Sequence, residues 1–412
     1  MLKKTPTNEL RLGMYISELD RPWTDTNFLL QGLSLETTDD IEQVQEQCAY
    51  VFIDSDDATE DSVREFGIHT SNPRAGIREI LNNIPHDYDY PVTLPVEREL
   101  EAAKQAYNRA AGVFHSIWNR IRENKAFNST EFRPAIQNIV GSIIRNPDAF
   151  LLLRTICDDR DYNCRHALNS CALATAFARH LGLYPEELVT IATGAFLLDI
   201  GKARMPEDLL NKRGQLTEDE TELLRLHATS GADILGSVYD VSESVIEMVK
   251  SHHERDNGEG YPLAIDGNQI PVYARIAAIV DSFDAITIER PYKKALTAFE
   301  GLHIIRQASN IDFQEGLSEA FTCCLGNYPT GSVVELTNGY TATVIEQNPA
   351  DTQRPRVLIL SANGKSLDKK RIIIDLNSQL SSSGHAPIEI CKVVINNLPD
   401  TRLINRVISN AA

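Results

Sequence analysis

The 412-residue sequence lacks a long apolar run, since no stretch of about eighteen or more uncharged apolar residues occurs. A helix that crosses a bilayer needs about 20 such residues, so we expect no membrane span. The first residues, Met1 to Lys4, lead into polar residues rather than into the apolar stretch of a signal peptide. Together these absences predict a cytoplasmic protein.

Cysteine is too sparse for a disulfide framework. The seven cysteines are odd in number, and no two of them form a Cys-x-x-Cys pair. This spacing argues against both a disulfide scaffold and a zinc ribbon. We therefore expect reduced and mostly buried thiols at positions 48, 157, 164, 171, 323, 324 and 391.

Positive charge is also scarce, because 40 Lys and Arg face 58 Asp and Glu, which gives a net charge of −18. Proteins that bind nucleic acid normally present a basic face, so DNA and RNA are excluded as expected partners. A small anionic ligand stays compatible with this charge if bound metal and a few local cations reverse the field inside one cleft.

The length of the chain predicts two or three domains, because it exceeds what one hydrophobic core usually organises. Residues 1–65 predict a small α+β module, with strands at Leu10–Ile16 and Tyr50–Ile53 and a helix between them. Residues 66–145 predict a linker and helical connector. The segment from Asn72-Pro73 to Pro95 holds several prolines and few periodic apolar positions, and a helical pattern follows from Glu97 to Asn124.

Residues 146–326 predict a series of amphipathic helices. Pro185 opens one helix, and Thr217 with Glu220 forms a capping box for the next, which we expect to carry His227. Ser242 is the expected cap of a third helix. A fourth is expected to run from Pro271 to Asp281.

After residue 328 the pattern changes to strands. Two are predicted at Val333–Leu336 and Tyr340–Ile345, on either side of the turn dipeptide Asn338-Gly339. Further strands are expected at Val357–Leu360, before Asn363-Gly364, and at Arg371–Asp375. Residues 327–380 therefore predict a small β-rich module, and residues 381–412 an irregular tail. The expected fold is multidomain, with a central all-α bundle flanked by two small modules.

Six imidazole and carboxylate side chains in the helical segment fall at or near helix ends. They are His166, Asp199, His227, His252, His253 and Asp281. A lone histidine is more often a packed core or surface residue, but two adjacent histidines gain little from packing. Mixed imidazole and carboxylate ligands suit iron, manganese, nickel or zinc, and two metals that share an aspartate form a clamp for phosphoester hydrolysis.

Four ordered motifs resemble those of the HD-GYP family, part of the HD superfamily of cyclic di-GMP phosphodiesterases. His252–Pro262 (HHERDNGEGYP) is similar to the loop that names the family, and Leu198–Lys202 (LDIGK) is similar to its His-Asp-x-Gly-Lys motif. Asp281–Lys293 contains the Asp-Ser-Phe-Asp-Ala and Arg-Pro-Tyr-Lys segments of the later signature. His166–Asn169 and His227 stand where the family's other histidines stand. The first 65 residues resemble an uncharacterised module that often precedes such domains, and the β-rich tail resembles their extensions.

The resemblance implies a hydrolase of bacterial second-messenger signalling that cleaves cyclic di-GMP to pGpG or GMP. It implies divalent metal ions, often iron or manganese, with Asp199 bridging two of them. His227, His252 and His253 would complete the shell of one metal, and His166 with Asp281 would hold the other. A metal-bound hydroxide would be the nucleophile, because a bound metal lowers the pKa of water toward neutrality.

Four further side chains acquire roles from the resemblance. Lys202, Arg290 and Lys293 would neutralise the substrate phosphates, and Lys202 would act beside the catalytic Asp199. Ordinary surface charge is the alternative for these cations. Tyr261 would either stack on a guanine or fill the underside of its loop.

The sequence departs from the family pattern at the first residue of the His-Asp motif, where Leu198 replaces a histidine ligand. Leucine offers no lone pair, so we expect one metal site to be weakened. Asn257 stands where aspartate is usual and should preserve the turn. No glutamate precedes His166 in the position of a third metal's ligand, where Asp161 and Tyr162 occur, so two metals are expected.

Two classes of function therefore stay open. The first is a metal-dependent phosphodiesterase of reduced activity. The second is a degenerate domain that acts as a cyclic-dinucleotide receptor or as an interaction partner, for example of a diguanylate cyclase (GGDEF) protein. Hydrolysis of another phosphoester, and a homodimeric state, are compatible with the same sequence.

Overall fold

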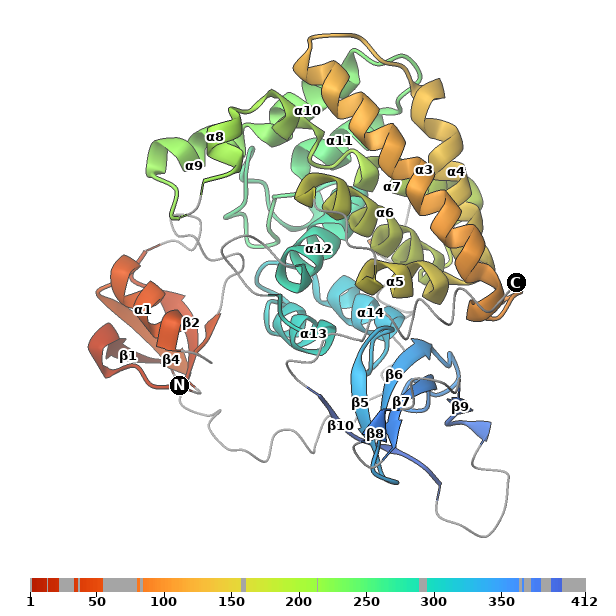
Figure 1. Cartoon of the computed structure of the whole chain (residues 1–412). Helices are drawn as coiled ribbons and strands as arrows, with labels where there is room; N and C mark the ends of the chain where they lie inside the picture. Colours follow the sequence, from red (N-terminus) through yellow and green to blue (C-terminus); the bar gives the residue numbers. More distant parts are fainter. Residues whose placement is uncertain are drawn as a thin grey trace.

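The computed structural model describes most of the chain. The described residues are 2–12, 14–21, 33–35, 38–54, 80–81, 84–156, 161–212, 214–288, 295–362, 365–366, 372–378 and 387–394. They form a small N-terminal module, a helical body and a C-terminal β module (Figure 1). The predicted multidomain fold with a central helical bundle is confirmed.

The N-terminal module is a four-stranded antiparallel sheet with one helix. The strands are β1 (Leu2–Pro6), β2 (Tyr15–Leu19), β3 (Leu33–Ser34) and β4 (Tyr50–Asp54), in the order β1-β4-β2-β3. Val44 of helix α1 (Thr38–Gln47) and Cys48, which directly follows the helix, pack against buried residues of the sheet. The predicted α+β composition is therefore confirmed for this module.

One predicted strand in this module is wrong over most of its length. The sequence predicted a strand at Leu10–Ile16, but pairing begins only at Tyr15, which lies opposite Ser34. Residues Thr7–Glu9 form a 3-10 turn that redirects the chain after β1. Leu12, which the alternation placed in a strand, is 54% exposed. The alternation of Leu10, Leu12 and Met14 therefore does not correspond to a strand at these three residues.

The helical body contains the long connector helix and the helices that hold the candidate site. The first group is α3 (Val96–Arg122), α4 (Ser129–Arg145), α5 (Pro147–Ile156), α6 (Tyr162–His180) and α7 (Pro185–Phe196). The second group is η4 (Ile200–Arg204), α8 (Glu207–Leu210), α9 (Glu218–Arg225), α10 (His227–Gly236) and α11 (Glu243–Ser251). The third group is α12 (Val272–Thr287), α13 (Ala298–Gln307) and α14 (Glu315–Leu325). Most of α6 is buried, and α3, α4, α5, α7, α12 and α14 pack around it.

Local capping signals set several of these helix starts. Helix α7 begins with Pro185 at its first position, and the capping box of Thr217 and Glu220 opens α9 as predicted. His227 does not belong to that helix, because α9 ends at Arg225 and His227 is the first residue of α10. Ser242 occupies the cap position of α11 without a side-chain capping bond.

The C-terminal module is a six-stranded antiparallel sheet. Its strands are β5 (Val333–Leu336), β6 (Tyr340–Glu346), β7 (Arg356–Ala362), β8 (Lys365–Ser366), β9 (Ile373–Asp375) and β10 (Ile390–Val393). The order is β10-β5-β6-β7-β8, and β9 also pairs with β7. The predicted hairpin turn at Asn338-Gly339 is confirmed, with Gly339 at φ 77°. Asn363-Gly364 lies outside the described residues.

The prediction of an irregular tail is wrong at β10, which pairs with β5 at the edge of the sheet. An edge strand with exposed Cys391 and Lys392 lacks the apolar alternation that announces a buried strand. The six described cysteines are free thiols, as predicted, and Cys48, Cys164 and Cys171 are buried.

The β module and the helical body share a core and a buried polar contact. Ile345 and Leu358 belong to the main hydrophobic cluster of the helical body. Asn146 donates to Glu346 over 2.7 Å, and Asp148, in the first turn of α5, accepts from the backbone N–H of Gln347 over 3.0 Å. Helix α5 is therefore fixed to the β module at its N-terminal end.

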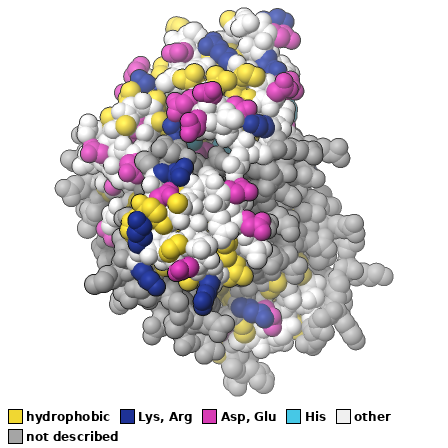
Figure 2. Space-filling view, turned by 90° about the vertical axis from the view of Figure 1, so that its left-hand side faces the viewer, with side chains coloured by type: hydrophobic (Ala, Val, Ile, Leu, Met, Phe, Trp, Pro, Cys, Tyr) yellow, Lys and Arg dark blue, Asp and Glu magenta, His cyan; other side chains and the backbone are white. Residues whose placement is uncertain are grey.

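Among the described residues, every helix is too short or too polar to span a lipid bilayer. Figure 2 shows acidic and basic side chains intermingled on the face that it presents.

Candidate metal centre

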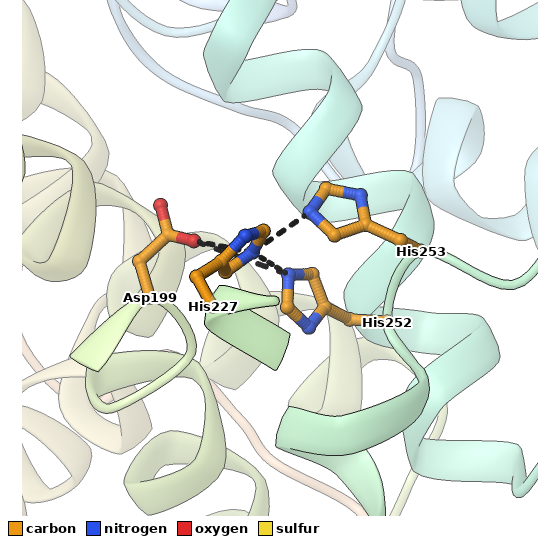
Figure 3. Close-up of side chains that lie close together, drawn as sticks. All are labelled: Asp199, His227, His252 and His253. Atoms are coloured by element: carbon orange, nitrogen blue, oxygen red, sulfur yellow. Dashed lines mark hydrogen bonds and ion pairs between the residues drawn. The ribbon is translucent and has the colours of Figure 1, made fainter. Parts of the chain in front are cut away.

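Six side chains from five separate places in the helical body converge on one buried region. His166 comes from the N-terminal part of α6 and Asp281 from α12, while Asp199 directly precedes η4. His227 opens α10, and His252 and His253 directly follow α11. Figure 3 shows Asp199 and the last three histidines pointing toward one another.

A close backbone contact brings Asp199 and His227 together. A Cβ on Gly201 would lie 2.0 Å from the carbonyl oxygen of His227 and 2.6 Å from the amide nitrogen of Gly231. Only glycine allows η4 and α10 to approach so closely. The glycine of the Asp-x-Gly-Lys motif therefore has a packing role, which sets the separation of two candidate ligands.

The first candidate group comprises Asp199, His227, His252 and His253, and one ligand atom from each lies within 4.8 Å of the others. Nε2 of His227 lies 3.2 Å from Oδ1 of Asp199, 3.4 Å from Nε2 of His252 and 3.1 Å from Nε2 of His253. Nitrogens that lie so close together cannot all carry protons without repulsion.

Backbone carbonyls orient two of these imidazole rings. Nδ1 of His227 donates to the carbonyl of Leu224, and Nδ1 of His252 donates to that of Val249, each over 2.7 Å. Their Nε2 lone pairs therefore face the centre. Burial lowers the pKa of His252 to about 4 and holds that of His253 well below its usual range, so both are neutral at pH 7.

The second candidate group comprises His166, Asp199 and Asp281. Nε2 of His166 lies 3.0 Å from Oδ1 of Asp281 and 3.4 Å from Oδ2 of Asp199. Burial opposes charge on His166, but hydrogen bonds to Asp281 and Asp284 raise its pKa to about 10. Burial likewise opposes charge on Asp281, but the adjacent His166 lowers the pKa of that carboxyl to about 2. Without a bound cation, the proton on His166 partly balances the carboxylates.

Asp199 belongs to both groups. Burial would raise its pKa, but the charge of Lys202 and the adjacent His227 imidazole hold it well below its usual range. Nζ of Lys202 donates to Oδ2 of Asp199 over 2.5 Å. Oδ1 of Asp199 is buried and accepts no hydrogen bond from the described residues, although Nε2 of His227 lies 3.2 Å away and Nε2 of His252 lies 4.0 Å away. This donor set fits a divalent metal ion, because lone pairs that converge without protons are stabilised by a cation.

The residue that breaks the family pattern lies in the hydrophobic core. Leu198 is 1% exposed and belongs to the main apolar cluster. Asp161 caps α6 by accepting from the amides of Asn163 and Cys164, and Tyr162 stacks parallel to His166 with ring centroids 5.8 Å apart. Neither residue belongs to the two candidate groups, so the described part of the chain offers His166, Asp199 and Asp281 to the second group.

The loop from His252 to Ile265 covers one side of the first group. Tyr261 stacks on His253 with centroids 4.5 Å apart, and Cζ of Arg225 lies 5.3 Å from its ring centre. A Cβ on Gly260 would lie 2.4 Å from the Arg255 amide nitrogen, so the loop closes tightly on itself. The amide of Glu259 donates to Oδ1 of Asn257 over 3.0 Å, and this bond closes the turn that asparagine was expected to preserve.

Two of the predicted phosphate-binding cations, Arg290 and Lys293, lie outside the described residues. Lys202 is described and is 18% exposed at its side chain, next to Asp199. It therefore combines contact with the shared carboxylate and access to solvent.

Sequence reasoning missed a buried network behind His166. Asp284 accepts from Nδ1 of His166 over 2.8 Å, from Asn169 over 2.9 Å and from Nε of Arg154 over 3.2 Å. Both Asp284 and Asn169 lie inside the motifs that carry the family resemblance. The available signal was spacing, because Asp281 and Asp284 are three residues apart and share one helix face.

Three family models match consecutive parts of the chain. A domain of unknown function (DUF3391) matches residues 2–132, an HD domain matches residues 151–314, and a KOW domain associated with HD domains matches residues 333–382. The HD-domain match contains all six converging side chains.

Curated relatives are similar to this chain over most of its length or over a part of it. Cyclic di-GMP phosphodiesterase PA4108 of Pseudomonas aeruginosa is 32% identical over 383 residues, covering 91% of this chain and 89% of that protein. The response regulator RpfG of Xanthomonas campestris, a cyclic di-GMP phosphodiesterase, is 40% identical over 126 residues, which cover 30% of this chain and 33% of the relative. 3′3′-cGAMP-specific phosphodiesterase 1 of Vibrio cholerae is 33% identical over 158 residues, which cover 38% and 36%.

Proposed function

Because this chain belongs to the HD-GYP family of HD-domain cyclic di-GMP phosphodiesterases, we propose that it hydrolyses cyclic di-GMP to pGpG or GMP with bound divalent metal. One observation carries the proposal: two ligand groups that share Asp199 lie within the HD-domain segment. A site of this composition serves phosphoester hydrolysis, because paired cations neutralise the phosphate and lower the pKa of water.

The chain's own residues would position and neutralise the substrate. His227, His252 and His253 with Asp199 would hold one metal, and His166 with Asp281 and Asp199 the other. Lys202 carries a fixed positive charge next to the shared carboxylate, where it can face a substrate phosphate. Tyr261 is held against His253 and fills the side of the loop, so its ring is available to a base only along its exposed part.

The direct test is turnover under defined metal. Anaerobically purified protein is loaded with excess Mn²⁺ or Fe²⁺, mixed with cyclic di-GMP, and its products are separated by chromatography. We expect pGpG or GMP, and no product from Asp199→Asn, which removes a carboxylate from both groups. A parallel reaction with 3′3′-cGAMP decides between the substrate classes of the relatives. Absence of turnover with every metal, in a folded and metal-loaded chain, would refute the proposal.

A receptor is the second candidate function, and the burial of Leu198 favours it. The chain keeps the first group of four ligands but offers only three residues to the second. Loss of a residue that only orients a metal ligand costs about 10–100-fold in metal affinity or activity. Loss of a ligand itself should cost no less. A chain with one firmly bound metal would bind a cyclic dinucleotide without cleaving it, which calorimetry detects as heat of binding without product.

The substitution Leu198→His separates the two candidates. A histidine at this position would restore an imidazole to the second group, so we expect metal content per chain and turnover to rise together. A tenfold or larger gain in turnover, as an order of magnitude, would show that the natural chain is a weakened enzyme. Equal turnover in the two chains, with equal metal content, would show that position 198 does not limit the metal site.

A further inference from the structure

Behind the second ligand group, the side chain of Asp284 is fully buried and surrounded by donors. Its Oδ2 accepts from Nδ1 of His166 over 2.8 Å. Its Oδ1 accepts from Nδ2 of Asn169 over 2.9 Å and from Nε of Arg154 over 3.2 Å. The two oxygens therefore accept from different donors: Oδ2 from the imidazole, and Oδ1 from the guanidinium and the amide.

This arrangement determines which nitrogen of His166 faces the centre. A carboxylate accepts but does not donate, so Nδ1 must carry a hydrogen in order to bond to Oδ2. Nε2, which lies 3.0 Å from Asp281 and 3.4 Å from Asp199, is then the nitrogen left for a metal. Arg154 in turn is 8% exposed at its side chain and also donates to Thr287 on the same helix as Asp284.

Resting on the proposed function, we propose that Asp284 is the positioning residue of the second metal site. Held by Arg154 and Asn169, it orients His166 so that Nε2 can bind the metal. A buried ion pair that served only to hold α5 against α12 would need no contact with a candidate metal ligand such as His166. Because Arg154 and Asn169 donate to Oδ1 of Asp284, its Oδ2 is left to accept from Nδ1 of His166 and to fix the orientation of that ring.

The substitution Asp284→Asn tests this role because an amide has one acceptor and one donor end. The amide oxygen should take the place of Oδ1, where Arg154 and Asn169 both donate. The NH₂ group would then face Nδ1 of His166, which must become an acceptor, and the hydrogen moves to Nε2. The imidazole would present a hydrogen to the metal, so we expect the second site to lose about 10–100-fold in affinity.

The readout is binding of Mn²⁺ alone, measured as metal per chain and by calorimetric titration of the full-length chain. The wild type should take up two Mn²⁺, and Asp284→Asn should keep the first and weaken the second. Asp148→Asn is the matched control, because it also neutralises a buried aspartate of the helical body and lies outside both ligand groups. It should bind Mn²⁺ as the wild type does.

The substitution Arg154→Gln keeps the test valid if Asp284→Asn does not fold. It leaves Asp284 in contact with His166 but removes the cation on Oδ1, so a smaller loss at the second site is expected. In the double variant, the effects should not add, because both act through one imidazole. Wild-type affinity for the second Mn²⁺ in both single variants would overturn the proposal, as would a wild type that stays at one Mn²⁺ per chain up to millimolar metal.

The outcome is independent of the substrate. A chain that loses its second Mn²⁺ in Asp284→Asn but never cleaves cyclic di-GMP would keep this inference and refute the proposed function. A chain that cleaves cyclic di-GMP, but whose two single variants both bind the second Mn²⁺ with wild-type affinity, would refute this inference and keep the proposed function.

Discussion

At the residue scale, Glu254 holds the loop that covers the histidines. Its side chain is buried, and its two oxygens accept from the amides of Leu263 over 2.7 Å and Ile265 over 3.2 Å. We predict that Glu254→Gln loosens the loop, because one of the two amides would face an NH₂ group. An unsatisfied buried donor costs about 1–3 kcal/mol, so exchange of one of these amide hydrogens should accelerate about tenfold.

Hydrogen exchange of the peptide that contains Leu263 and Ile265 measures this effect. Glu259→Gln is the control, because that side chain is exposed in the same loop and should leave exchange unchanged. Unchanged exchange in Glu254→Gln would show that the loop is held by its other contacts, such as the bond from the Tyr261 amide to the His253 carbonyl.

The sequence allowed the prediction of residues that meet at the centre but not of those that orient them. His252 and His253 are adjacent in a recognisable loop motif, so their joint role could be predicted from the sequence alone. The role of Asp284 depends on how α5 and α6 approach α12, since Arg154 and His166 are 130 and 118 residues away in sequence. The spacing of three residues between Asp281 and Asp284 is compatible with one shared face of α12, but it does not indicate the partners of Asp284.

At the scale of elements, the contact between η4 and α10 leaves no room for a side chain at Gly201. We predict that Gly201→Ala displaces α10, because the new Cβ would meet backbone atoms of His227 and Gly231 that cannot rotate away. Overpacking of this kind costs about 1–3 kcal/mol or more. Urea unfolding should show the loss, and Mn²⁺ titration should show weaker binding at the first group, since His227 moves with α10.

Gly236→Ala provides the matched control on the same helix. Nothing lies within 4 Å of the position of its Cβ, and it is the last residue of α10. Replacing this glycine should stabilise the chain slightly, by about 0.4–1 kcal/mol, because alanine has fewer unfolded conformations. A Gly201→Ala variant as stable as Gly236→Ala would refute the close contact.

Element starts were more predictable than element ends. Pro185, Thr217 and Glu220 act through their nearest neighbours, so the sequence predicted where α7 and α9 begin. The end of α9 at Arg225 has no comparable local signal. The packing of α10 against Gly201 places His227 at the start of a new helix.

At the scale of the whole molecule, the order of the modules was predictable and their docking was not. Apolar periodicity changes from helical to alternating near residue 328, which separates the β module from the helices. The buried contacts between them join Asp148 to Thr330 and Asn146 to Glu346, across 182 and 200 residues. No local sequence pattern indicates contacts between residues that are so far apart in the sequence.

This docking contact should make stability depend on pH. Burial raises the pKa of Asp148 to about 6, the charge of Glu346 adds to the rise, and the bonds from Thr330 and the Gln347 amide and the charge of Arg179 oppose it. The unfolded chain releases this proton near 3.8, so the native state binds more protons between these two values. Stability therefore falls as pH rises through this window, by on the order of 3 kcal/mol, and stays lower above pH 6.

The substitution Asp148→Asn should remove this dependence. The amide oxygen can accept from the Gln347 amide, and the NH₂ group can donate to the Thr330 hydroxyl, which can act as donor or acceptor. Both bonds survive while the buried charge is lost, so the variant should exceed the wild type in urea-unfolding stability by about 1–3 kcal/mol at pH 7.5. The two chains should converge at pH 4, where Asp148 is protonated in the native state. A variant less stable than the wild type at pH 7.5 would show that the charged form of Asp148 stabilises the joint between helices and sheet.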